Sequence, residues 1–430
     1  MYEKIFYSKL NLGLKPPHKD TCKLCDTLAV KIRATEAEPD SEQKVACLSS
    51  LKTDTELHHR RVELARTSML NDKKAAIEGK CSVLTFDLQK TIMLPKVPTG
   101  VVYYKRQLAC YNLGIHNCAT SKGTMHLWHE GVAGQGPDEI GSCLLKYLST
   151  FPSMERLVLW SDSCGGQNRN IKLVVLLMCL VSDPSCSIKE VTQKFAIPGH
   201  SYLPNDSDFG HIEKKMMKQQ HIFTLDEVKN IIETCRVKKE AFDVMIMKSS
   251  DFYRSNEITH AITNRKQHDG KKVSWLNIRV LRVSREKPFV MEYKYSHNED
   301  IQFEEVSFAK RLKGIQTPLH KLVLKQTQPK PIKDVKKKDI ESMLPFVPPV
   351  YHTFYHSILA ATTQTASTLC ATREISNQEN EPNESNTINC LQSCAEDPSV
   401  PTETEDREEY WDSEQFEENA DDDPTWERKN

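Results

Sequence analysis

The chain has 430 residues, enough for two or three domains, with 38% hydrophobic and 27% charged residues. Neither a secretion signal nor a membrane span is expected. Met1–Phe6 carries charge where a signal peptide is apolar, and the longest apolar run, Leu173–Val181, is far shorter than the roughly 20 residues that cross a bilayer. The 14 cysteines lack the spacing of a disulfide framework, which favours free thiols or metal ligands.

The charge of the chain is divided between two segments. The net charge is -1, from 58 Lys+Arg and 59 Asp+Glu, but Ser376–Asn430 holds 18 of the acids and 3 of the bases, a net charge of -15. The other 55 bases and 41 acids give the body a net charge of +14. A basic body with an acidic tail is typical of a protein that binds a polyanion such as DNA. Residues 361–430, rich in Thr, Ser, Asn and Glu, are predicted to be disordered.

The N-terminal part of the chain is polar and is predicted to be helical, with a zinc site. Cys22 and Cys25 form a C-x-x-C pair, and His58 or His59 on the following helix is a candidate third ligand. Cys47 is a candidate fourth ligand, since zinc takes four ligands in a tetrahedron. The alternative is that the two cysteines of the pair are ordinary thiols.

A dense pattern of strands and helices follows. Three predicted strands come first, and then helix, strand, helix, strand and helix alternate. In chain order these are Val83–Leu88, Gly100–Leu113, Thr124–Trp128, a helix that opens at Pro137, Leu157–Trp160, a helix over Asn170–Val181, Val191–Ile197 and a helix from Asp208 or Phe209 through Lys218. An antiparallel meander that leads into a parallel α/β half is the element order of the ribonuclease-H-like fold.

The predicted fold class is therefore α/β, a ribonuclease-H-like mixed sheet flanked by helices, with an N-terminal helical region and a disordered C-terminal tail. Strand candidates continue after this core at Phe242–Met247, Val273–Arg282 and Phe289–Tyr293, and Lys330–Lys338 is a basic stretch. The predicted domains are 1–80 (helical, with the zinc site), 81–236 (core), 237–360 (accessory α/β region) and 361–430 (acidic tail).

Two of the apolar strands end on an aspartate. Asp87 follows the first strand and Asp162 follows the strand at Leu157–Trp160, while Asp206 and Asp208 precede or open the last helix. A carboxylate at the end of a buried strand is unfavourable unless something compensates its charge. Three such acids on elements that converge indicate a divalent-metal site for phosphoryl transfer.

Six motif blocks resemble a large and mostly uncharacterised family of transposon-derived proteins whose core is similar to a ribonuclease-H-like transposase domain. The resemblance extends from about Asp20 to about Tyr355. The blocks are Leu84–Lys90, Tyr103–Leu108, Tyr111–His116, Glu139–Lys146, Ser161–Asn170 and Gly199–Phe209.

The resemblance implies a DDE/D nuclease site that holds Mg²⁺ or Mn²⁺. Asp87 would lie within a strand and Asp162 at the end of the neighbouring parallel strand. The family pattern favours Asp208 as the third acid, with Asp206 and Glu213 as alternatives. The competing interpretation is that the acids at the start of the last helix only cap it.

Four further residues are candidates for contact with nucleic acid. Gln167, Asn168 and Arg169 follow a glycine turn that would let backbone N–H groups approach a phosphate at a helix start. His200 would orient a water molecule or a phosphate. A tight turn and a hydrogen-bonded loop histidine are the respective alternatives.

The leading interpretation is a transposase-derived protein that binds DNA, cleaves or joins strands and is nuclear or cytoplasmic. The rival interpretation is a non-enzymatic DNA-binding or protein-interaction module with an unused site. A homo-oligomer is left open. Members of the family often carry further N-terminal sequence, and Met1 lies shortly before the cysteine pair, so a truncated copy is also expected.

Overall fold

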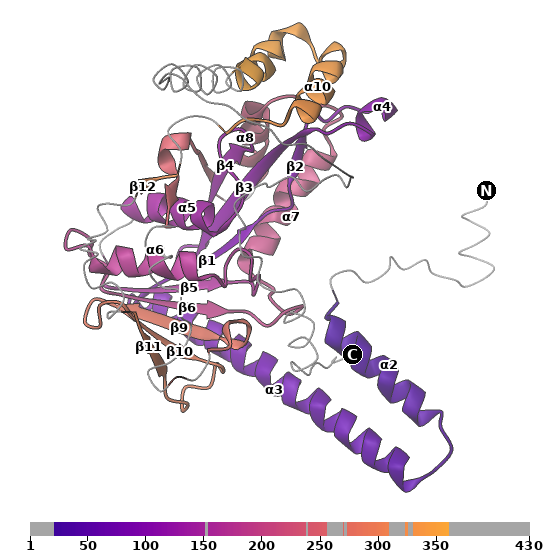
Figure 1. Cartoon of the computed structure of the whole chain (residues 1–430), viewed down its shortest axis with the longest axis vertical. Helices are drawn as coiled ribbons and strands as arrows, with labels where there is room; N and C mark the ends of the chain where they lie inside the picture. The colour runs from indigo at the N-terminus through magenta and orange to yellow at the C-terminus, as the bar shows by residue number, and fades with distance from the viewer. Residues whose placement is uncertain are drawn as a thin grey trace, which may run out of the picture.

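The computed structural model (Figure 1) describes residues 21–150, 154–237, 240–255, 270, 273–308, 323–325 and 330–360. The predicted disorder of the acidic tail lies outside these residues. No helix in this described part is long and apolar enough to span a membrane. The cysteines in the same ranges are free thiols.

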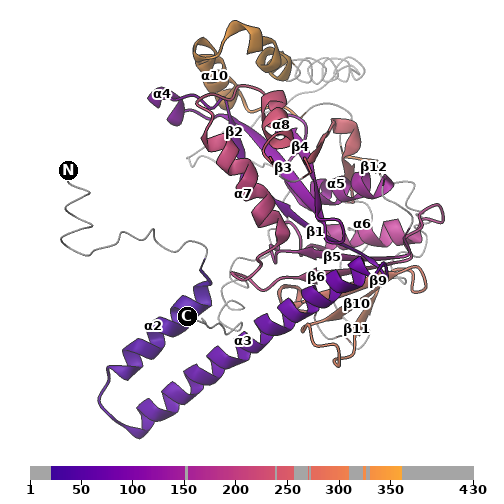
Figure 2. The same cartoon turned by 180° about the vertical axis from the view of Figure 1, so that it is seen from behind.

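The N-terminal region is a helical hairpin, as predicted. It consists of α2 (Lys23–Glu36) and the long α3 (Glu42–Ile77), and the side chain of Ser41 caps α3 by accepting a hydrogen bond from the amide of Lys44 at 3.1 Å. The far end of the hairpin projects from the molecule, while the second half of α3 lies along the core (Figure 2).

Ten strands of the described residues form one mixed sheet in the order β11-β10-β9-β6-β5-β1-β3-β4-β7, with β2 paired to β3. A separate pair consists of β8 (Tyr253–Arg254) and β12 (Val323–Leu324). The strands of the sheet are β1 (Ser82–Leu88), β2 (Ile92–Leu94), β3 (Leu108–Asn117), β4 (Lys122–His129), β5 (Arg156–Ser161), β6 (Glu190–Phe195), β7 (Asp243–Ile246), β9 (Val280–Ser284), β10 (Val290–Lys294) and β11 (Glu304–Ser307).

The centre of the sheet is a meander joined to a parallel half. β1 pairs antiparallel with β3, and β3 pairs antiparallel with β4. On its other edge β1 pairs parallel with β5, which pairs parallel with β6. The predicted mixed sheet flanked by helices is therefore confirmed.

One predicted strand along the chain needs correction. The strand expected over Gly100–Leu113 begins only at Leu108, and Gly100–Tyr103 forms the short helix α4. The reason is that β2 already pairs with the start of β3, so the chain between them must reverse direction. The basic stretch at Lys330–Lys338 leads into the helix α10 (Asp334–Met343).

The expected boundary at residue 236 does not divide the sheet. β7 pairs parallel with β4, and β9 pairs antiparallel with β6, so strands from both sides of the boundary share one sheet. The strand candidates after residue 237 are found as β7 and β9, which are shorter than predicted, and β10, which has the predicted length and is shifted by one residue.

Helices cover both faces of the sheet (Figure 1). The helices α5 (Pro137–Ser149) and α6 (Ile171–Ser182) pack in a core that contains Leu84 and Phe86 of β1. On the opposite face Val83 packs with Ala76 of α3. The helices α7 (Pro204–Met217) and α8 (Leu225–Glu233) pack in a further core with residues of β3 and β4. The odd-numbered residues of β1 therefore face α3 and α7.

Candidate functional site

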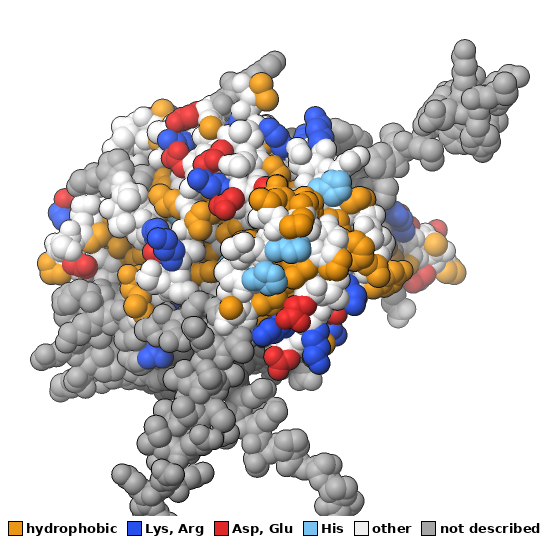
Figure 3. Space-filling view, turned by 90° about the horizontal axis from the view of Figure 1, so that it is seen from above, with side chains coloured by type: hydrophobic (Ala, Val, Ile, Leu, Met, Phe, Trp, Pro, Cys, Tyr) orange, Lys and Arg blue, Asp and Glu red, His pale blue; other side chains and the backbone are white. Residues whose placement is uncertain are grey.

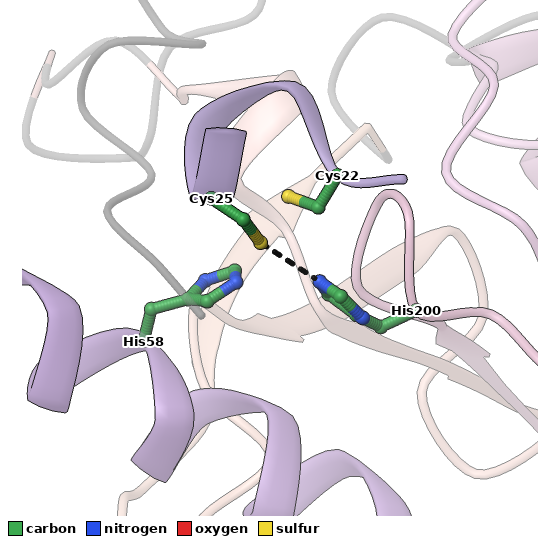
Figure 4. Close-up of side chains that lie close together, drawn as sticks. All are labelled: Cys22, Cys25, His58 and His200. Carbon is green, nitrogen blue, oxygen red and sulfur yellow. Dashed lines mark hydrogen bonds between the residues drawn. The ribbon is translucent and has the colours of Figure 1, made fainter. Parts of the chain in front are cut away.

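Four potential metal ligands converge where the helical hairpin meets the core (Figure 4). Cys22 precedes α2 and Cys25 lies in its first turn, His58 lies on α3, and His200 lies in the loop between β6 and α7. One ligand atom from each residue lies within 4.8 Å of the other three. We call these four residues the Cys/His cluster; it can hold a metal ion.

The spacing of the donor atoms is close to that of a tetrahedral site. The Cys25 Sγ and His200 Nε2 atoms lie 3.6 Å apart. Bond lengths of about 2.3 Å to sulfur and 2.0 Å to nitrogen place such a pair roughly 3.5 Å apart around one ion. The upper limit of 4.8 Å for the other pairs requires a contraction of about 1.5 Å at most.

The environment favours the protonation state that binds metal at two of the four ligands. A hydrogen bond from the Cys25 thiol lowers the pKa of Cys22 to about 5, and the same interaction raises the pKa of Cys25. Burial lowers the pKa of His58, which is 1% exposed, so its ring is neutral. Neither ring nitrogen of His58 has a hydrogen-bond partner among the described residues, which leaves two buried polar atoms unsatisfied.

The structure brings together three of the predicted zinc ligands and replaces the fourth. Cys22, Cys25 and His58 meet, whereas Cys47 is exposed and has its Sγ 4.0 Å from the Thr35 hydroxyl. The neighbouring His59 is not part of the cluster. His200, predicted to contact nucleic acid, occupies the fourth position instead, and it is buried.

Asp87 and Asp162 lie on one face of the sheet. The parallel register pairs Thr85 of β1 with Trp160 of β5, and two further residues along each strand bring Asp87 opposite Asp162. Adjacent strands are about 4.8 Å apart, and alternate residues point to the same face. Both carboxylates therefore face α3 and α7.

The first turn of α7 brings a third acid to this position. The Asn205 side chain accepts a hydrogen bond from Thr85 Oγ1 at 2.5 Å and donates one to the Gly114 carbonyl at 2.9 Å. Gly114 of β3 pairs with Asp87 of β1. Asn205 therefore links the start of α7 to both of these strands close to Asp87. A Cβ at Gly114 would lie 2.8 Å from the Phe209 ring, so only glycine allows this close packing. Asp206 follows Asn205 directly.

The pKa of Asp87 depends on both other acids. Burial raises this pKa most, repulsion from Asp162 and from Asp206 adds to the rise, and the resulting pKa is about 7. Asp206 is exposed, whereas Asp87 and Asp162 are half-buried, and among the described residues only the Cys/His cluster brings three or more potential ligand atoms within 4.8 Å of one another. We call Asp87, Asp162 and Asp206 the carboxylate site.

Asp208, the favoured third acid, is engaged elsewhere. Its Oδ2 atom accepts from His116 Nδ1 at 2.7 Å and its Oδ1 atom pairs with Arg236. Two residues apart on a helix point about 200° from each other, so Asp206 and Asp208 cannot both face Asp87. The choice of Asp208 is corrected to Asp206. The other alternative, Glu213, is exposed and lies about 10 Å farther along the axis of α7.

The loop after β5 fixes the orientation of Asp162. Its Oδ1 atom accepts hydrogen bonds from the Cys164 amide at 3.2 Å and from the Asn168 side chain. Its Oδ2 atom accepts none of the hydrogen bonds seen among the described residues.

The predicted nucleic-acid contacts of this loop are not supported. Asn168 and Arg169 are 1% and 4% exposed, so they offer no surface to a nucleic-acid backbone. Gln167 alone is half-buried. The amides that follow the glycines do not open a helix, because those of Asn168 and Arg169 donate to the Cys164 carbonyl and α6 begins at Ile171.

Comparison with known proteins gives one match. A family described as a domain of unknown function (DUF7869) matches residues 105–298, which run from just before β3 to just after β10. The matched segment contains Asp162, Asp206 and His200, whereas Asp87 and the other three members of the Cys/His cluster lie before it. No curated protein and no solved structure matches the chain.

Proposed function

We propose that this chain is a transposase-derived protein with a ribonuclease-H-like core that binds DNA and uses the carboxylate site for metal-dependent cleavage or transfer of DNA strands. The observation that carries the proposal is that Asp162, just after β5, and Asp206, at the start of α7, both lie near enough to Asp87 of β1 to raise its pKa.

The arrangement of the core strands supports the assignment of the fold. The five strands of the meander and the parallel half lie in the order β4-β3-β1-β5-β6, so the first strand of the core is central. The helix α5 follows the meander, α6 connects the two parallel strands and α7 follows the last of them. This is the element order that the sequence analysis attributed to the ribonuclease-H-like fold.

The three carboxylates are of the chemical type that holds a divalent cation, although their oxygens do not all lie within 4.8 Å of one another. Carboxylate oxygens are hard ligands that suit Mg²⁺ and Mn²⁺, and the mutual repulsion that raises the pKa of Asp87 would be relieved by bound positive charge. When bound, such ions activate a water or a 3′-hydroxyl and stabilise the leaving oxygen of a phosphodiester. Asp87, Asp162 and Asp206 would hold the ions, while Asn168 and the Cys164 amide keep Asp162 oriented.

We propose zinc as the metal of the Cys/His cluster. Two thiol sulfurs and two imidazole nitrogens within 4.8 Å of one another match a structural Cys₂His₂ site, in which all four positions belong to the protein. The ion would join the N-terminal hairpin to the loop that leads into α7.

The net charge of +14 on residues 1–375 supports DNA as the partner, because clustered Lys and Arg release counterions from the phosphate backbone. The rival proposal, a DNA-binding module without activity, shares this charge but does not need the three acids. The two proposals are therefore separated by chemistry at the carboxylate site and not by DNA binding.

The experiment is a nicking and strand-transfer assay on plasmid DNA with Mg²⁺ or Mn²⁺, using the full chain. Wild type should nick or join DNA, and Asp162→Asn should lower the rate on the order of a thousandfold, which corresponds to about 4 kcal/mol of barrier. Asparagine keeps the shape of aspartate and removes the charge that would hold a cation.

The matched control is Glu213→Gln, which neutralises an exposed acid on the same helix as Asp206. This variant should keep the wild-type rate. If wild type binds DNA but produces no nicked or joined product with either cation, the chain belongs to the non-enzymatic class.

A further inference from the structure

The loop between β6 and α7, residues 196–203, connects the two candidate metal sites. His200 of this loop belongs to the Cys/His cluster, and Asp206 of the carboxylate site lies six residues later in the first turn of α7. Any force that holds the loop against the hairpin therefore acts on the segment that carries Asp206.

The backbone of this loop is pressed against the first zinc ligand. Gly199 has a φ of +74°, and a Cβ at this position would lie 2.7 Å from both Cα and Cβ of Cys22. Neither contact is with the end of a flexible side chain, so no substituent fits without separating the loop from α2. The turn is closed by a hydrogen bond from the His200 amide to the Ile197 carbonyl at 2.9 Å.

Apolar contacts hold the two ends of the loop to the same hairpin. Ile197 packs with Val62 and Ala65 of α3, and Leu203 packs in a cluster that contains Ala76 of α3. These two patches are small, since Ile197 packs with only two buried residues in its cluster. The middle of the loop depends on the Cys/His cluster itself.

Without a bound ion the cluster holds the loop weakly. Both ring nitrogens of His58 are buried without a hydrogen bond among the described residues, and a buried polar atom in this state is unfavourable. A metal ion would satisfy one of them and would bind His58 and His200, from α3 and from the loop, to a single centre.

We propose that metal in the Cys/His cluster restrains the loop before α7 and, together with the hydrogen bonds of Asn205 to β1 and β3, fixes the position of Asp206, so that binding of the structural ion and binding of the catalytic cation are positively coupled. The coupling to the second ion rests on the proposed function, whereas the fixing of the α7 start does not. A ligand that orders a segment favours a second ligand that needs the same order.

The test uses the full chain, zinc-loaded and after zinc removal by a chelator that is then dialysed away. Hydrogen exchange of the amides at 203–209 should be slow with zinc and markedly faster without it, while the amides of β1 stay protected. Calorimetry with Mn²⁺ should give a dissociation constant about 5- to 100-fold weaker after zinc removal.

Two glycine variants distinguish an effect of the loop contact with Cys22 from an effect of backbone strain alone. Gly199→Ala keeps all four ligands but forces a Cβ into Cys22, and it should reproduce the faster exchange and the weaker Mn²⁺ binding. Gly79→Ala is the matched control, because Gly79 has a similar φ of +72° but no atom within 4 Å of an added Cβ. It should leave both measurements unchanged.

The outcomes distinguish this proposal from the proposed function. Unchanged hydrogen exchange at 203–209 after zinc removal would overturn the proposal. Loss of protection throughout β1 would also overturn it, because zinc would then stabilise the whole fold. If hydrogen exchange at 203–209 depends on zinc but the protein binds no Mn²⁺, the zinc-dependent ordering of the α7 start is supported and the proposed function is contradicted.

Discussion

The Cys/His cluster and the carboxylate site differ in their ligands and in how the fold assembles them. The first uses sulfur and nitrogen atoms from the hairpin and one distant loop, and burial keeps His58 neutral. The second uses carboxylates of the core, and there burial and repulsion raise the pKa of Asp87. Thiolate and imidazole donors suit a structural zinc ion, while carboxylate oxygens are the type of donor that Mg²⁺ prefers.

The two sites also differ in whether the protein supplies every ligand of the metal. The Cys/His cluster offers four protein ligands and so leaves no position for a substrate. At the carboxylate site the Oδ2 atom of Asp162 accepts none of the hydrogen bonds seen in the described ranges. The predictions below test whether this difference is real.

Zinc content gives the largest expected effect. The full chain should contain about one equivalent of zinc by elemental analysis, since one tetrahedral site is present. His200→Asn should lose the metal because it removes a ligand, whereas Cys47→Ser should keep it because Cys47 lies outside the cluster. If both variants bind zinc equally well, His200 is not a zinc ligand and the Cys/His cluster as described is contradicted.

Replacement of Asp206 and of Asp208 should affect the free energy of unfolding to different extents. Asp208→Asn leaves Arg236 buried without its partner and should lower the free energy of unfolding by about 3 kcal/mol. Asp206→Asn removes repulsion in the metal-free protein and should change the same quantity by about 1 kcal/mol or less. Urea unfolding of both variants checks this, and an equal loss would mean that Asp206 also has a structural role.

The pH dependence of stability should identify Asp87. Its pKa is about 7 in the folded protein and 3.8 for an ordinary aspartate in water, so between these pH values the folded state binds more protons than the unfolded state. Stability of the metal-free protein therefore falls as pH rises from 4 to 7, by roughly 2 kcal/mol after allowance for partial exposure.

Asp87→Asn should remove this part of the pH dependence, and saturating Mg²⁺ should reverse its sign, because the ion binds the ionised acid. Unfolding free energies at pH 5 and pH 8 measure both effects. A wild-type slope that Asp87→Asn leaves unchanged would assign the titration to another group.

The sequence predicted the elements whose burial pattern is simple. β1 and β5 are apolar runs that end at an aspartate, and α5 opens with Pro137 at its first position, so their places followed from the pattern alone. The strand at Gly100 was wrong because apolar residues in a short connection have no periodicity that separates helix from strand.

The sites were harder to predict for two physical reasons. Asp208 was favoured by the family pattern, and the last helix was expected to begin near it, whereas α7 begins at Pro204 and Asp208 is paired with His116 and Arg236. Proline at the first helical position was the available signal. His200 could not be found as a ligand from spacing, because it comes from a loop far from Cys22 in sequence and only the packing of Gly199 brings it there.

The most direct test of the central claim is thermal unfolding of the zinc-loaded full chain with and without Mg²⁺, for wild type and Asp162→Asn. A cation that binds only the folded state at about 100 times its dissociation constant adds about 2.7 kcal/mol, so the melting temperature of wild type should rise by about 5 °C. Asp162→Asn should show almost no rise. No rise in wild type with either Mg²⁺ or Mn²⁺, or an equal rise in both proteins, would contradict a cation site at Asp87, Asp162 and Asp206.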